Sequence, residues 1–230
     1  MEGADELLRG GDEGFWEHWR DALLPAIADS RPLRMDVIVE PSFAGRSWLA
    51  ELDPAVLSGV VDGGLVTGRV IVPPETLESP AEDLIELALG TGFEVRVLAG
   101  LSSCAIYDGA AVVLPEPDAA GAPAHRLIRR ASVVERIEAL FELRWATAIP
   151  WGEYRKGAAG VLHLLALGWS DARIAAALGV SPRTVSRRVA EAMAAAGARS
   201  RFQLGMRHAL ASADGENTTT PGRAGRRLEG

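Results

Sequence analysis

The stretch GWSDARIAAALGVSPRTVSRRV, residues 168–189, predicts two short helices joined by a turn. Ser170 is a suitable N-cap, because its hydroxyl can accept a hydrogen bond from a free amide, and Gly179 is a suitable stop. Ser181 is a second N-cap, and Pro182 falls at the first helical position, where a missing N–H costs nothing. We therefore expect a tight helical pair in this part of the chain.

The second helix of this pair is predicted to be amphipathic and to end at Gly197. Its apolar stripe consists of Val185, Val189, Ala192 and Met193. With that stripe turned inward, the arginines between these residues face outward. A cationic N-terminal half of a second helix is the part of a helix-turn-helix that enters the DNA major groove. The alternative is a surface helical hairpin with solvated arginines, but caps, turn, stripe and charge agree on the helix-turn-helix.

The charge of the chain is divided between its two ends. Residues 151–210 contain nine basic and three acidic residues, a net charge of +6, whereas residues 1–150 contain 12 arginines and 25 acidic residues, a net charge of −13. The whole chain has a formal charge of −7. A polyanion is thus attracted to the C-terminal part and repelled by the rest, as expected for a DNA-binding module joined to another domain.

Composition indicates a protein of a reducing compartment. With Cys104 as the single cysteine, no intrachain disulfide can form. We find no N-terminal signal segment and no apolar run of the ~20 residues that a spanning helix needs, and therefore expect a cytoplasmic protein with no membrane contact.

The N-terminal part predicts an α/β domain over residues 33–150. Five short β-branched runs predict strands at residues 35–39, 69–72, 93–98, 104–107 and 111–114, with helices between the first three at 47–61 and 79–89. Strand–helix alternation favours right-handed crossovers and a mostly parallel sheet. Asp108-Gly109 predicts a hairpin turn, so an antiparallel pair should end the sheet. A helix from about Ser132 to Ala148, with Val134, Ile137, Phe141 and Trp145 on one face, completes the domain.

An N-terminal segment and a C-terminal tail flank the two predicted domains. Within the N-terminal segment 1–32, residues 1–11 are expected to be frayed and residues 12–29 to form a helix. The aromatic stripe of this helix is either core or a dimer interface. The break Ile149–Gly152 is the predicted domain boundary. Tyr154 to Leu167 should form the leading helix of a DNA-binding domain over 151–210, and residues 211–230 a disordered tail.

The C-terminal module resembles the LuxR-type helix-turn-helix over residues 154–210. The residues that carry the resemblance are VLHLL at 161–165, Gly168, Ser170, IA at 174–175, LGVS at 178–181, TV at 184–185 and GARSR at 197–201. The last segment, which leads into a fourth helix at 200–210, distinguishes this family from region 4 of sigma factors. The resemblance implies a transcription regulator that binds duplex DNA.

Carried over by position, the LuxR-type resemblance assigns roles to individual residues. Base-reading positions fall on Ser186, Arg187 and Ala190. Phosphate contacts fall near Arg173, Thr184, Arg188 and Arg199, and Arg183 is a further outward-facing cation. Ser186 stands where lysine is frequent, so no operator sequence can be transferred. Arg187 has the geometry for a bidentate contact to guanine O6 and N7, worth about 1–3 kcal/mol of discrimination.

The α/β domain resembles the degenerate phospholipase D-like domain of TrmB-type regulators, which also occurs beside LuxR-type modules in actinobacterial proteins. The strand order and the Pro73-Pro74-Glu75 loop carry the resemblance. In active relatives a strand bears His-x-Lys-x4-Asp, and here Leu101 and Ser103 occupy the histidine and lysine positions, leaving Asp108. Because the histidine and the lysine are both missing, the resemblance implies a non-catalytic domain. Such a domain senses an effector or mediates dimerisation.

We therefore predict a DNA-binding transcription regulator that forms a homodimer on an inverted-repeat operator. No catalytic, metal or cofactor site is expected, because the four histidines are scattered over separate elements and Lys156 is the only lysine. Whether the domain binds an effector stays open; the site for a small molecule would lie at the carboxyl ends of the parallel strands, around residues 40–43, 73–76 and 99–102. Contact with RNA polymerase stays open. The alternative function is a phosphodiesterase-like enzyme with an appended DNA-binding module.

Overall fold

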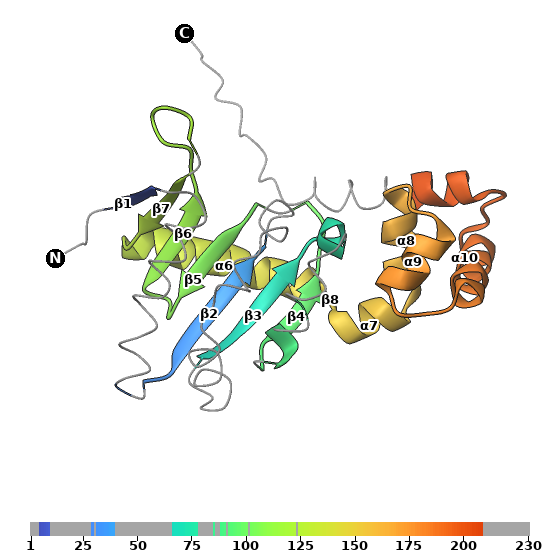
Figure 1. Ribbon diagram of the computed structural model, residues 1–230, viewed down its shortest axis with the longest axis horizontal. Coiled ribbons are helices and arrows are strands. Elements are labelled where there is room, and N and C mark those ends of the chain that lie inside the picture. The colour runs from blue at the N-terminus through green and yellow to red at the C-terminus, as the bar shows by residue number, and fades with distance from the viewer. Residues whose placement is uncertain are drawn as a thin grey trace, which may run out of the picture. The chain divides into compact units, whose positions relative to one another are not determined.

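In the computed structural model the chain divides into two compact units, Met1–Tyr154 and Arg155–Gly230 (Figure 1). The structure describes residues 5–9, 29, 31–39, 66–77, 85, 88–90, 92–100, 102–122 and 124–208. The first unit is α/β and the second is entirely helical in these residues, which confirms the predicted fold class. The division falls within helix α7 (Trp151–Lys156).

Eight strands of the described residues form one sheet in the first unit, in the order β1-β7-β6-β5-β2-β3-β4-β8. Their bounds are β1 Glu6–Arg9, β2 Leu33–Ile38, β3 Val66–Val72, β4 Glu94–Val97, β5 Cys104–Tyr107, β6 Ala111–Pro115, β7 Ala124–Ile128 and β8 Ile149–Pro150. The short 3-10 helix η1 (Pro74–Leu77) follows β3. Each of the five strands predicted from sequence overlaps one of these strands.

The sheet is mixed, and the expectation of a mostly parallel sheet holds only at its centre. β2, β3 and β4 pair in parallel, with Val37 opposite Val70 and Val70 opposite Val95. All other pairings between the described strands are antiparallel, including β5 with β2 and the predicted hairpin of β5 and β6. Short connections join β5 to β6 and β6 to β7, and such connections favour antiparallel pairing.

Three strands were not predicted. Glu6–Arg9, expected to be frayed, forms β1 and pairs antiparallel with β7. β7 itself is short and contains His125 and Arg126, so its pattern is only weakly apolar. Ile149 and Pro150 form β8 against Val97 and Arg96, where we expected only a break. β1 and β8 each depend on a partner distant in sequence, which local patterns do not reveal.

One face of the sheet is covered by helix α6 (Ala131–Thr147), which runs across the strands in Figure 1. The helix lies within one residue of its predicted bounds at either end. Its buried residues Val134, Phe141 and Trp145 pack with Ile38, Ile71, Cys104, Ile106, Val112 and Ala148. The other face has its own apolar cluster, formed by Leu33, Met35, Val66, Ala105, Tyr107, Val113 and Leu127. The predicted apolar face of α6 is therefore confirmed.

A buried ion network lies between β2, β3 and α6. Asp36 is 4% exposed and accepts hydrogen bonds from Arg69 Nε (2.9 Å) and Nη2 (2.7 Å). Arg69 also donates to both carboxylate oxygens of Glu142, at 3.1 and 2.6 Å. Its guanidinium lies over the rings of Phe141 (4.8 Å) and Trp145 (5.1 Å). The hydrogen bond to Asp36 is the main cause of its raised pKa.

The helical unit contains α8 (Ala158–Ala166), α9 (Asp171–Ala177) and α10 (Pro182–Ala196), followed by a helical segment at residues 201–208. We had predicted one leading helix from Tyr154 to Leu167. The structure breaks it at Gly157, whose extended backbone (φ −88°, ψ 176°) separates α7 from α8. Glycine has low helix propensity, and at this position it serves as the N-cap residue of α8.

Several predicted segments lie outside the described residues. They are residues 12–28 of the helix predicted at 12–29, the helix at 47–61, most of the helix at 79–89, the tail at 211–230, Leu101 and residues 40–43; Asp29 is described and lies in a turn. Of the segment 79–89, the described residues Ile85, Ala88 and Leu89 are helical. Among the described helices, none has the length and apolarity to cross a membrane.

Candidate nucleic-acid interface

The two helices of the central pair begin and end at the predicted residues. The Ser170 hydroxyl accepts from the Arg173 amide (3.3 Å), and the Ser181 hydroxyl accepts from the Thr184 amide (3.1 Å). Pro182 occupies the first turn of α10. Gly197, with φ 59°, ends α10 in the left-handed conformation that glycine adopts most readily.

The turn between α9 and α10 is held by Arg155. Its Nε donates to the Leu178 carbonyl oxygen (3.3 Å). Gly179 has a φ of 61°, and a Cβ at this residue would overlap the Arg155 guanidinium. The left-handed backbone conformation therefore favours glycine in the turn, and a larger residue would also displace the Arg155 guanidinium.

The inner face of α10 consists of Val185 and Val189, which are 0% and 1% exposed, and the half-buried Ala192 and Met193. They complete the core that Val161, Leu164, Ile174, Ala175 and Leu178 contribute from α8 and α9. This burial fixes the rotation of α10 about its axis, because an alternative rotation would expose valines and bury arginines. The predicted stripe of α10 is confirmed.

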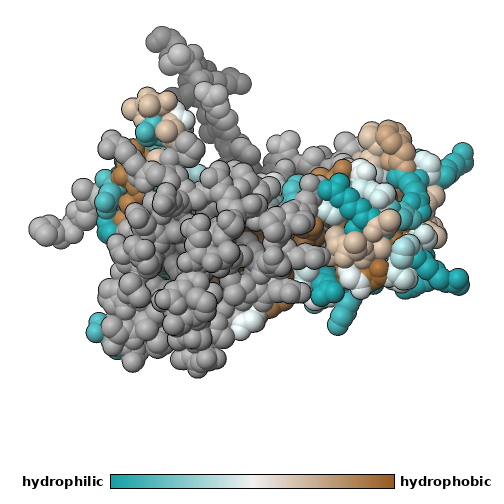
Figure 2. Space-filling view, in the orientation of Figure 1, coloured by the Kyte–Doolittle hydropathy of each residue, from teal (hydrophilic) through white to brown (hydrophobic). Residues whose placement is uncertain are grey.

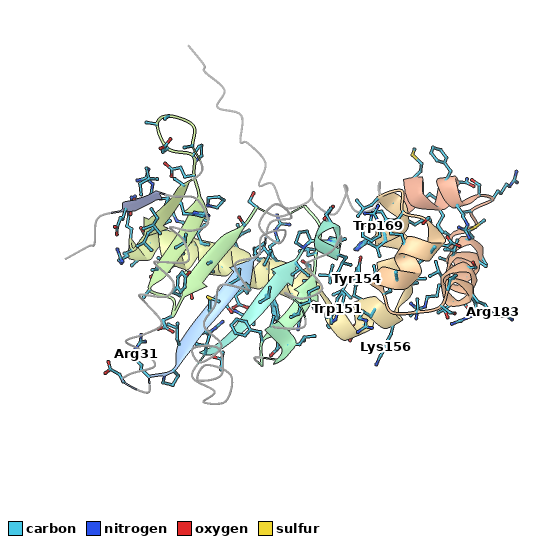
Figure 3. All side chains as sticks on the ribbon, in the orientation of Figure 1. Arg31, Trp151, Tyr154, Lys156, Trp169 and Arg183 are labelled. Carbon is cyan, nitrogen blue, oxygen red and sulfur yellow. The ribbon has the colours of Figure 1, made fainter. Side chains whose placement is uncertain are left out.

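The outer face of α10 presents the predicted base-reading residues. Arg183, Ser186, Arg187 and Ala190 are all exposed, and Figure 3 shows Arg183 on the outer side of α10. Arg187 donates to Glu191 one turn later (2.6 Å), with both side chains about 60% exposed. Such an exposed pair is worth little and can give way to a stronger partner. Hydrophilic side chains project from the helical unit in the space-filling view of Figure 2.

Ser186 and Arg201 share a carboxylate. Asp171, the first residue of α9, accepts two bonds from Arg201, at 2.5 and 3.0 Å, and a third from the Ser186 hydroxyl at 3.1 Å. The Arg201 bonds are the largest cause of the lowered pKa of Asp171, to which the Ser186 bond contributes. The cluster joins α9, α10 and the helical segment 201–208. Sequence analysis did not find Asp171 or Arg201, because the two lie 30 residues apart.

Arg188 is placed differently from the other arginines of α10. Its Nη1 donates to the carbonyl oxygens of Arg155 (3.0 Å) and Gly157 (3.4 Å), at the end of α7. Cations near a helix C-terminus satisfy free carbonyls and interact favourably with the helix dipole. In this structure Arg188 therefore holds α10 against the backbone between α7 and α8, while its side chain is partly exposed.

The remaining predicted phosphate contacts lie at helix starts. The Arg173 guanidinium lies 3.9 Å from the ring centroid of buried Trp169, and is exposed on its other side. The Thr184 hydroxyl is hydrogen-bonded to the Ser181 hydroxyl (2.9 Å). The backbone N–H of Arg199 donates to Gln203 Oε1 (2.7 Å). The backbone N–H of Gln203 in turn donates to the Ser200 hydroxyl (3.2 Å). Arg199 itself is exposed.

Two histidines meet inside the helical unit. The rings of His163 on α8 and His208 in the segment 201–208 have centroids 4.8 Å apart. Burial, together with the neighbouring His208, lowers the pKa of His163 to about 4. The pKa of His208 is also lowered by burial. The pair joins the last helical segment to α8.

In the α/β unit, Asp108 occupies a turn. It has a φ of 49°, and its carboxylate accepts from Arg31 Nη1 and from the Arg34 amide, both at 2.7 Å. These bonds stabilise the β5–β6 hairpin, as the turn interpretation of Asp108-Gly109 requires. Within the part of the chain that the structure describes, no group of three or more His, Cys, Asp or Glu side chains could hold a metal ion.

Comparisons with known proteins give one sequence match. Residues 153–198 match the family of homeodomain-like domains. No curated protein matches the chain. The chain therefore carries a homeodomain-like helix-turn-helix, while the LuxR-type assignment stays a hypothesis.

Solved structures with similar folds include three proteins, none above 18% identity. TrmBL2, an archaeal chromatin protein, is 18% identical, with a TM-score of 0.46 over 64% of this chain and 54% of that one. Nuc from Salmonella typhimurium, a phospholipase D family member, is 12% identical, with a TM-score of 0.43 over 64% and 97%. NucT from Helicobacter pylori is 13% identical, with a TM-score of 0.46 over 64% and 98%. The chain spans about half the length of TrmBL2.

Proposed function

We propose that this protein is a transcription regulator that binds specific duplex DNA through the outer face of α10. The observation that carries the proposal is the fixed rotation of α10. With Val185 and Val189 buried, Arg183, Ser186 and Arg187 project from its N-terminal half. That half is the part of a recognition helix that enters the major groove. The net charge of +6 over residues 151–210 supplies attraction to a polyanion.

The roles of the polar side chains follow from their placement. Arg187 reads guanine, because breaking its exposed bond to Glu191 costs little and a bidentate base contact repays the loss. The DNA phosphates are contacted by residues at the starts of helices, namely Arg173, Arg183, Thr184 and Arg199. The methyl group of Ala190 is available for an apolar contact with a base. Arg188 supports α10 from within, so we assign it no phosphate.

We further propose that the module is of the LuxR type and that the protein acts as a homodimer on an inverted repeat. The helical segment 201–208, joined to the module through Asp171 and His163, supports the LuxR-type assignment. A single recognition helix covers few base pairs, and two half-sites one helical turn apart supply useful affinity. Sedimentation should show a dimer on DNA; a monomer both free and bound would contradict the proposal.

The α/β unit is proposed to sense an effector or to mediate assembly, without catalysis. Asp108, the one residue left of the phospholipase D pattern, is engaged by Arg31 and by the Arg34 backbone. Catalysis of phosphodiester cleavage needs a nucleophile and a cation at the developing charge. Turnover of a phosphodiester by the purified protein, abolished by Asp108→Asn, would establish the enzyme instead.

The test of DNA binding is selection from a randomised duplex library with the full-length protein, followed by titrations at several salt concentrations. We expect an enriched sequence and an affinity that falls steeply with salt, because phosphate contacts release counterions. As a control, the same selection with Val185→Asp, which places a charge in the core of the module, should enrich nothing. Failure of the wild-type protein to enrich any duplex would contradict the proposal.

A further inference from the structure

The direction of one hydrogen bond limits what Ser186 can offer to DNA. Ser186 lies on the exposed face of α10, directly before Arg187, and its hydroxyl donates to Asp171 at 3.1 Å. A serine hydroxyl has one proton to donate and two lone pairs to accept. An ionised carboxylate can only accept, so the Ser186 proton must point to Asp171. The lone pairs are left for any group that approaches from outside.

Asp171 is well suited to hold this proton. Arg201 binds both of its carboxylate oxygens, at 2.5 and 3.0 Å, and so fixes the orientation of the group. Arg201 also lowers the pKa of Asp171, which keeps the carboxylate ionised at neutral pH. As the first residue of α9, Asp171 lies at a helix N-terminus, where negative charge is favoured. Neither the position nor the charge of the acceptor depends on DNA.

We propose that Ser186 is a specificity-determining residue that acts only as a hydrogen-bond acceptor and so selects a base with an exocyclic amino group, adenine or cytosine. The inference rests on the proposed function, in which α10 lies in the major groove. There adenine and cytosine each present an amino donor, whereas the facing edges of guanine and thymine present oxygen acceptors. A serine without such a partner can either donate to a base or accept from it, and so does not discriminate between bases. By holding the proton of Ser186, Asp171 restricts the contact to bases that donate.

Neighbouring Arg187 has the opposite preference, because a guanidinium only donates. The two residues together therefore predict a site in which a guanine, read by Arg187, lies close to an amino-bearing base, read by Ser186. Removing the single acceptor of Ser186 should reduce discrimination at that base by about two- to tenfold, the range for one hydrogen bond. The effect should be confined to one base pair in each half-site.

The experiment compares the duplex selected by the wild-type protein with single-base substitutions in it, using full-length variants. Wild-type protein should prefer adenine or cytosine at one position, and Ser186→Ala should abolish that preference. Asp171→Ala should abolish it as well, because the freed hydroxyl can then donate to guanine or thymine. Glu153→Ala, which removes one exposed negative charge elsewhere in the module, should keep it.

A base analogue tests the same contact without changing the protein. Replacing the selected adenine with purine, which lacks only the amino group, should weaken wild-type binding about two- to tenfold and leave Ser186→Ala unaffected. A Ser186-dependent preference for guanine or thymine would overturn the inference, as would an amino-base preference that survives in Asp171→Ala. An enriched duplex with no position dependent on Ser186 overturns this inference alone. Failure to enrich any duplex overturns the proposed function itself.

Discussion

Arginines serve opposite purposes in the two units of this chain. In the α/β unit Arg69 is 16% exposed, bound to two carboxylates and covered by two aromatic rings. On α10, the Arg183 guanidinium is exposed and makes no hydrogen bond or ion pair with any residue that the structure describes. The Arg187 guanidinium is paired with one exposed side chain, Glu191. The number of arginines therefore does not predict a cationic surface. What decides it is whether acidic and aromatic side chains surround the guanidinium.

Arg69→Leu should give the largest effect and tests the buried half of this comparison. It would leave Asp36 buried with Arg34 as its remaining partner among the described residues, and breaking a buried pair costs about 3–5 kcal/mol. Denaturant unfolding, followed by near-UV circular dichroism, should show this loss of stability in the α/β unit. As a control, Arg126→Leu breaks the more exposed pair with Glu116 and should change little. Equal effects of the two variants would contradict the comparison.

Arg187→Ala tests the exposed half. We expect a loss of about 1–3 kcal/mol in discrimination between the best duplex and one with its guanine replaced. Arg173→Ala should weaken all duplexes about equally and reduce the salt slope by about one, as for one fewer phosphate contact. Binding titrations with both variants at several salt concentrations separate these outcomes. If Arg187→Ala changed neither affinity nor specificity, the assignment of α10 as the recognition helix would be wrong.

Arg188→Ala sharpens the comparison. Arg188 belongs to α10, but its guanidinium is engaged by other groups of the protein, as that of Arg69 is in the α/β unit. Loss of its bonds to the Arg155 and Gly157 carbonyls should lower the stability of the helical unit by about 1–2 kcal/mol. The salt slope of DNA binding by the folded variant should stay close to that of the wild type. A slope reduced by one, without loss of stability, would restore Arg188 as a phosphate contact.

A pH titration should give the smallest effect. His163 has a folded pKa of about 4, below the value of about 6.5 in an unfolded chain. The unfolded state then binds more protons between these values, so stability is fully present above pH 6.5 and is lost as the pH falls towards 4. The denaturant concentration at the unfolding midpoint of the helical unit should therefore decrease as the pH is lowered from 7 to 5. His163→Phe should weaken this dependence, and an unchanged dependence would exclude His163 as its source.

The helix-turn-helix could be predicted closely because its signals are local. The caps Ser170 and Ser181 bond to amides three residues later, and Gly179 and Gly197 stop helices by their own backbone conformation. The Val185–Val189 stripe needs only helical periodicity. Such interactions span three or four residues, so the sequence contains both partners in one window. The exposed placement of Arg183 and Arg187 followed from the same stripe.

The α/β unit was predicted less completely because sheets pair distant residues. Strand runs were recognisable, but the antiparallel placement of β5 beside β2 was not. Nor did local pattern indicate that Glu6–Arg9 pairs with β7. Alternation and β-propensity identify a strand, whereas its neighbour depends on how the complete sheet buries its two faces.

The sequence alone determined that this chain ends in a cationic helix-turn-helix, because caps, periodicity and charge are properties of short windows. Only the tertiary structure decided what the individual polar groups do. Arg188 supports the backbone, and Ser186 gives its proton to Asp171, which Arg201 holds from a helical segment 30 residues away. These assignments depend on distances of about 3 Å between residues far apart in sequence. Hydrogen bonds are directional and short, so only the folded chain selects them.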